Sequence, residues 1–145
     1  MASGGEGAAP RIWRRWFDTA IGREPAPRGL VVAHGVDLQA GTYVLSLEPV
    51  DGQPSAYRVN GIEEQRPIWN TRLYVFLPLG DERFERRAFG PGAKNTPEEA
   101  FAAFNALPEQ DRSFTLAAPE RLVFHAGFDY RDNEGRMCVV IRQIA

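Results

Sequence analysis

The chain has 145 residues, of which 43% are hydrophobic and 25% charged, as is usual for one globular domain. The net charge of −2 gives no reason to expect nucleic-acid binding, which usually needs a basic surface. A single cysteine, Cys138, excludes an internal disulfide and a cysteine-cluster metal site. No apolar run approaches the length of a bilayer span, and residues 1–10 lack a signal-peptide pattern. We therefore expect a cytoplasmic protein and do not expect a membrane surface as its partner.

Residues 1–10 are mostly small and predict a flexible tail. Residues 11–22 carry the clearest pattern in the chain, and at 100° per residue they predict an amphipathic helix. Its apolar half contains Ile12, Trp13, Trp16, Phe17, Ala20 and Ile21, and its polar half contains Arg11, Arg14 and Arg15. Such a helix is too short to be stable alone in water, so it must dock on something. Prolines in the following segment predict a linker, so residues 11–28 form a unit separate from a domain over residues 29–145.

Strand-like runs fill most of the remaining chain. Residues 30–38 and 42–50 predict an antiparallel meander, in which Tyr43, Leu45 and Leu47 share a face. Residues 72–80 are apolar on both alternations, which indicates a central strand, and the charged residues 82–89 indicate an edge strand. Residues 121–130 and 136–144 predict a final antiparallel pair joined by a turn.

One helix is predicted over residues 96–107. Thr96 is its expected N-cap, Pro97 occupies the first position, and Glu99 completes a capping box. The expected fold is therefore α+β: a mostly antiparallel sheet of five to seven strands, with this helix packed on one face. The sequence leaves open whether the sheet is flat or curls into a half-barrel.

Candidate catalytic residues are few. His34 and His125 each precede a glycine and an aspartate, and on a regular strand His125 and Asp129 share a face. That arrangement suits a general base oriented by a carboxylate, but ordinary strand histidines fit the same pattern. Cys138 lies in an apolar run, which indicates a buried and inert thiol. The sequence contains no signature for a metal, a cofactor or a named reaction.

Two functions remain open. The first is a non-catalytic binding or adaptor domain that contacts a protein partner, or a second copy, through Ile12, Trp13, Arg14, Arg15, Trp16, Phe17 and Ile21. The alternative is a small-ligand-binding protein or small enzyme, with a pocket between the sheet and the 96–107 helix. His34, His125 and Asp129 would line that pocket, and Tyr43, Tyr74 and Tyr130 would supply hydroxyl groups.

Overall fold

A computed structural model describes residues 11–19, 35–59, 69–80, 83–126 and 133–145. The elements in chain order are β1 (Ile12–Asp18), β2 (Gly35–Leu38), β3 (Gly41–Glu48), β4 (Tyr57–Val59), β5 (Trp69–Asn70), β6 (Leu73–Gly80), β7 (Arg83–Phe89), α1 (Pro97–Ala106), the 3₁₀ helix η2 (Glu109–Arg112), β8 (Ser113–Leu116), β9 (Glu120–Ala126), β10 (Asn133–Glu134) and β11 (Arg136–Gln143). Within these ranges the chain is an α+β protein with antiparallel sheets.

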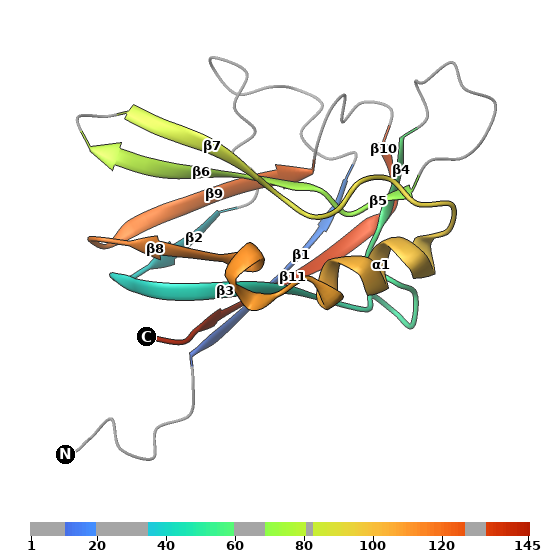
Figure 1. Cartoon of the computed structure of the whole chain (residues 1–145), viewed down its shortest axis with the longest axis horizontal. Coiled ribbons are helices and arrows are strands. Elements are labelled where there is room, and N and C mark those ends of the chain that lie inside the picture. The colour runs from blue at the N-terminus through green and yellow to red at the C-terminus, as the bar shows by residue number, and fades with distance from the viewer. Residues whose placement is uncertain (1–10, 20–34, 60–68, 81–82, 127–132) are drawn as a thin grey trace.

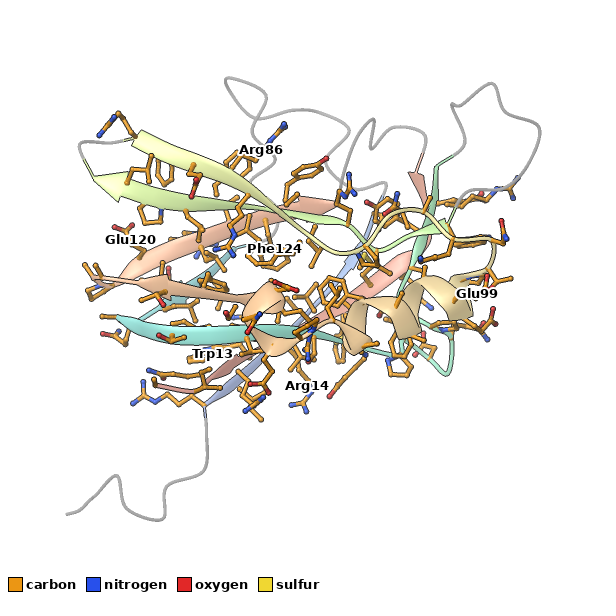
Figure 2. The ribbon with its side chains drawn as sticks, viewed as in Figure 1. Trp13, Arg14, Arg86, Glu99, Glu120 and Phe124 are labelled. Carbon is orange, nitrogen blue, oxygen red and sulfur yellow. The ribbon has the colours of Figure 1, made fainter. Side chains whose placement is uncertain are left out.

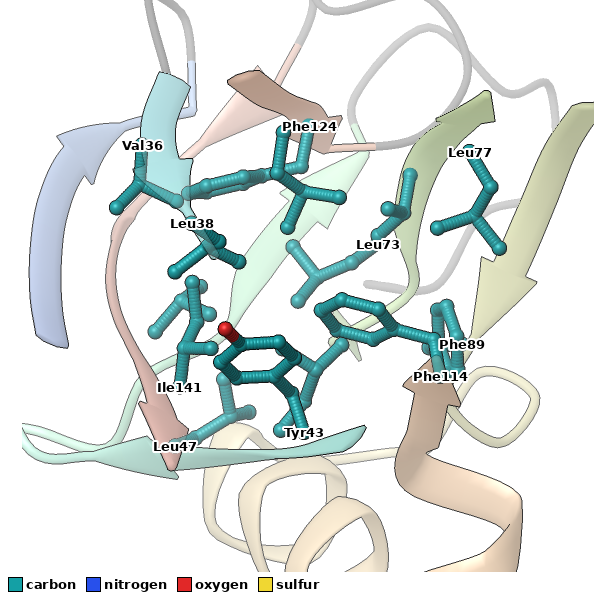
Figure 3. Close-up of a cluster of buried hydrophobic side chains, with 14 of the residues drawn as sticks. Val36, Leu38, Tyr43, Leu47, Leu73, Leu77, Phe89, Phe114, Phe124 and Ile141 are labelled. Carbon is teal, nitrogen blue, oxygen red and sulfur yellow. The ribbon is translucent and has the colours of Figure 1, made fainter. Parts of the chain in front are cut away.

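Two four-stranded sheets form the two layers of the fold, and Figure 1 shows them one above the other. Their strand orders are β1-β11-β3-β8 and β2-β9-β6-β7, and the short strands β10-β4-β5 form a third sheet. One apolar core lies between the two larger sheets (Figure 3). It includes Leu45 and Ile141 from one sheet and Leu73 and Phe124 from the other. Each sheet therefore buries its inner face against the other.

Helix α1 confirms the predicted N-cap at Thr96 and the proline in the first turn. The side chain of Thr96 accepts a hydrogen bond from the backbone N–H of Glu99, and Pro97 occupies the first turn. Phe104 is fully buried and belongs to the core. The next residue, Asn105, donates to the carbonyl of Leu47 and accepts from its N–H, both at 2.9 Å. The helix therefore lies along β3 at the place where β8 no longer pairs with it.

The predicted helix over residues 11–22 is wrong for the residues that the structure describes. Residues 12–18 form β1, which pairs with β11 from Ile12↔Arg142 to Asp18↔Arg136. A three-turn helix is only marginally stable in water. This strand instead forms a full ladder of hydrogen bonds with β11 and packs Trp13 against the core. Because β1 shares a sheet with β3 and β11, this segment is not separate from the rest of the fold.

Several strand pairings also differ from expectation. β2 and β3 do not form a hairpin, because β2 pairs with β9 while β3 pairs with β11 and β8. β9 and β11 likewise belong to different sheets. The expected single sheet of five to seven strands is wrong within the described ranges, where eleven strands form two four-stranded sheets and one three-stranded sheet. The β6–β7 hairpin, with β6 central and β7 at the edge, is confirmed.

The two tryptophans of β1 should respond differently to truncation. Trp13 packs on the core with its ring 5.9 Å from that of Tyr43, so Trp13→Ala should lower the free energy of unfolding by about 2–3 kcal/mol, less than for a fully buried ring. Trp16 is 71% exposed, so Trp16→Ala should cost less than about 1 kcal/mol. Urea unfolding of both variants measures this, and equal losses would contradict the assigned faces.

Asn105 should be as important for stability as a core residue. Asn105→Leu removes both hydrogen bonds to Leu47 and leaves two backbone groups of a residue that is 3% exposed without a partner. We expect a loss of about 2–3 kcal/mol in urea unfolding. Ala102→Leu, at an exposed position of the same helix, is the control and should be nearly neutral. Similar stability of the two variants would mean that the Asn105 side chain does not stabilise the backbone of Leu47 as a neighbouring strand would.

Candidate functional site

β1 lies at the outer edge of its sheet, and within the described ranges no strand pairs with its other side. The backbone N–H of Gln143 donates to the carbonyl of Arg11, and that of Thr19 donates to the carbonyl of Gly135. Because antiparallel strands alternate in bonding direction, the odd-numbered residues of β1 bond to β11. The N–H and C=O groups of Ile12, Arg14 and Trp16 therefore point off the edge. In agreement, the guanidinium of Arg15 donates to the outward carbonyl of Arg14 at 2.9 Å.

The side chains of β1 divide between the two faces of the sheet. Trp13 faces the core, while Ile12, Arg14 and Trp16 lie on the outer face by alternation (Figure 2 labels Trp13 and Arg14). Ile12 is 43% and Trp16 71% exposed. We call these three outer side chains, together with the outward backbone groups beside them, the β1 edge site. It combines apolar surface, a cation and outward backbone groups on one short segment, and of these groups the carbonyl of Arg14 already accepts from Arg15.

An ion pair fixes the centre of the β1 edge site. The Nε and Nη2 atoms of Arg14 lie 2.8 and 3.1 Å from Oε1 and Oε2 of Glu48 on β3. In the strand register Arg14 is opposite Val140, and Glu48 is opposite Cys138. The pair therefore crosses β11 above these two buried residues. The hydrogen bond from Arg14 lowers the pKa of the Glu48 carboxyl and raises the pKa of the Arg14 guanidinium.

Cys138 lies under this pair and is 1% exposed. Burial raises the pKa of its thiol, and the nearby carboxylate of Glu48 raises that pKa further, while a hydrogen bond with Trp16 opposes both. The thiol is therefore protonated at neutral pH and has little nucleophilic character. The prediction of a buried cysteine is confirmed, and Cys138 packs beneath Trp16 and Arg14.

Other sheet edges are protected in ways that β1 is not. Residues 83–88 of β7 are all exposed and mostly charged, with the guanidinium of Arg86 4.7 Å from the ring centroid of Tyr74. The edge of β3 is closed by Asn105 and by Arg112, whose Nη1 donates to the carbonyl of Leu45 at 2.8 Å. β2 has only four residues. Charged or covered edges resist pairing with other chains, so β1 is the long edge least protected within the described ranges.

A hollow of about 240 Å³ lies beside the N-terminus of α1. It is lined by Val50, Gln53, Pro54, Ala56, Trp69, Pro97, Gly135 and Arg136. Arg136 forms an ion pair with Asp51 at 2.7 Å, so its charge is already balanced at the rim. Most of the wall is apolar, and the hollow supplies no catalytic group.

The histidine hypothesis concerns residues that are largely outside the described ranges. His34, Asp129 and Tyr130 lie outside them, as does Ile21 of the predicted contact set. His125 is placed only by its backbone, opposite Tyr74 in the β9–β6 ladder, and Phe17 only opposite Met137. The hydroxyl of Tyr43 donates to the carbonyl of Gln39 at 2.6 Å, so it has a structural role. The space expected between α1 and the sheet contains Phe104, which belongs to the core.

Comparison with known proteins adds no assignment. No family model, no curated protein and no solved structure matches the chain. Among the described residues, no group of three acidic, histidine or cysteine side chains is close enough to hold a metal ion. No helix in the described part of the chain has the length and apolar character to cross a membrane.

The contacts of two residues, Glu48 and Asn105, could not be predicted from the sequence. The alternation in residues 42–50 places Glu48 on the polar side of its strand, but nothing in the sequence links it to Arg14, 34 residues away. Asn105 follows the buried Phe104 and looks like an ordinary helix end, although it is bonded to Leu47, 58 residues away. Both contacts depend on which strands become neighbours, and local patterns do not contain that information.

The ion pair between Arg14 and Glu48 should make stability depend on pH in a defined direction. The pKa of Glu48 is lowered on folding, so its contribution is present above the pKa of the unfolded chain and is lost as the pH falls through the folded pKa. We expect Arg14→Gln to raise the pKa of Glu48 toward its ordinary value, and to be less stable than wild type at pH 7, with a difference that shrinks as the pH falls through the folded pKa of Glu48. Both side chains are about half exposed, so the difference should be small.

NMR titration of the Glu48 carboxyl carbon and urea unfolding across this pH range measure the two effects. Arg121→Gln, which breaks an exposed pair with Asp37 on the other sheet, is the control and should leave the pKa of Glu48 unchanged. An unaltered Glu48 titration in Arg14→Gln would show that the pair does not hold in solution.

Proposed function

We propose that this protein is a non-catalytic binding or adaptor domain that associates with a protein partner through the β1 edge site. The single observation that carries the proposal is an edge strand of seven residues with outward backbone groups and a tryptophan that is 71% exposed. An unprotected edge of this kind is a template for a further strand. The contact element is thus the segment expected from the sequence, in the form of a strand instead of a helix.

The energetics support Trp16 as the main anchor. Covering the exposed part of the indole contributes about 3–4 kcal/mol at ~25 cal/mol per Å², before the cost of association is subtracted. Tryptophan and arginine dominate binding energy at protein interfaces, and both are present here. Arg14 is already held in place by Glu48, so it would lose little conformational freedom when a partner binds.

The chemistry of the β1 edge site favours a protein partner over a nucleic acid or a membrane. Of its three outer side chains only Arg14 is charged, and Glu48 neutralises it. Hydrogen bonds to a further strand satisfy the outward backbone groups, which neither a phosphate backbone nor a lipid headgroup can do along the whole strand. We further propose a cytoplasmic setting, because a chain with one unpaired thiol fits a reducing compartment.

A ligand-binding or catalytic role remains a prediction that no described residue favours. His34 and Asp129 lie outside the described ranges, and the hollow beside α1 is lined by other residues. We therefore do not propose a reaction.

Site-specific photo-crosslinking tests the proposed function. A photoreactive benzophenone amino acid at position 16 of the full chain, expressed in its own cells, should give defined cross-linked products after irradiation. The same group at position 84 is the matched control, because Phe84 is also an exposed aromatic residue (54%) on an edge strand, but on the charged edge. Products at position 16 that do not exceed those at position 84 would overturn the proposal.

A further inference from the structure

The direction of the outward backbone groups restricts how two β1 strands can pair. Ile12, Arg14 and Trp16 direct their N–H and C=O groups off the edge. If two copies meet in antiparallel fashion, hydrogen-bonded pairs form only between residues that both point outward. Even-numbered residues must then lie opposite even-numbered residues. The two residue numbers in each pair therefore have an even sum. For this reason the two-fold axis passes beside a single residue of β1, and that residue pairs with the same residue of the second copy.

Charge and the number of residues that stay paired select among these centres. Centring on Arg14 or on Arg15 puts that arginine directly opposite its counterpart, and centring on Trp13 puts Arg11 opposite Arg15. Like charges directly opposite each other destabilise a strand pair. Centring on Phe17 avoids these clashes, but only residues 16–18 of β1 then remain paired. The register centred on Trp16 brings no arginine opposite another and keeps residues 14–18 paired.

We propose that the partner at the β1 edge site is a second copy of this chain, paired antiparallel through β1 about a two-fold axis at Trp16. This inference rests on the proposed function. Trp16 then lies opposite Trp16 of the second copy, and aromatic pairs stabilise adjacent strands. Arg14 lies opposite position 18 of the second copy, which is an aspartate in the sequence, and symmetry repeats this pairing of positions. The segment is therefore complementary in charge to itself.

The assembly joins two four-stranded sheets into one continuous sheet across the axis. The outward backbone groups of residues 14, 16 and 18 become hydrogen-bonded in both copies. Because the pairing is isologous, each edge is used once and the assembly closes as a dimer. It therefore removes the unprotected edge of β1 without leading to a filament.

Disulfide trapping tests the register. Hydrogen-bonded partners in antiparallel strands have Cα atoms about 5.5 Å apart, within the range of a disulfide. Trp16→Cys should therefore give a disulfide-linked dimer of the full chain after mild oxidation. The experiment needs the Cys138→Ala background, since Cys138 is opposite residue 16 within the same chain and would capture the new thiol.

Arg14→Cys in the same background is the matched control. In the proposed register its counterpart is four residues along the strand, about 13 Å away, which is too far for a disulfide. We expect at least ten-fold less linked dimer than with Trp16→Cys. Equal cross-linking at the two positions would overturn the register, and circular dichroism checks that both variants are folded.

The mass of the unmodified full chain, measured by light scattering across a concentration series, completes the test. We expect a dimer, and Asp18→Arg should raise its dissociation constant about ten-fold or more, because it places an arginine opposite Arg14. A monomer at all concentrations, with no linked dimer from Trp16→Cys, would overturn the second copy as partner. If position 16 then still photo-crosslinks to a different protein, the proposed function survives without this inference. If it does not, both are wrong.

Discussion

The double pairing of β11 is the constraint on which the rest of the structure depends. β11 pairs with β1 on one side and β3 on the other, and its side chains are buried on both faces. Met137, Val139 and Ile141 enter the main core, while Cys138 and Val140 form a second cluster with Val50. This strand therefore fixes β1 as an edge and sets Glu48 within reach of Arg14. The β1 edge site exists because β11 is central.

The edges of the two larger sheets are protected to different degrees. Asn105 closes one by replacing a missing strand, and β7 protects another with charged side chains. β1 is less protected, because its exposed residues include Ile12 and a tryptophan beside the arginines. An unprotected edge risks uncontrolled pairing, a risk that the proposed pairing with a second copy would remove.

The N-terminal segment shows why a clean helical pattern can mislead. Its apolar residues fit a helical stripe, but on a strand they divide between two faces, with Trp13 inward and Trp16 outward. Helix propensity and periodicity are weak over so short a segment, and tryptophan, isoleucine and phenylalanine also favour strands. Pairing with β11, more than a hundred residues away, decided the outcome.

The sequence by itself determined the elements whose signals are local: the cap of α1 at Thr96, the β6–β7 hairpin, and the inward alternation of Tyr43, Leu45 and Leu47. These signals depend on neighbours within a few residues. Tertiary structure alone decided that β1 is a strand, that β2 and β3 belong to different sheets, and that Arg14 meets Glu48. Those features depend on which distant segments bury their apolar faces against one another. A single sequence shows which faces are apolar, but not which of them pack together.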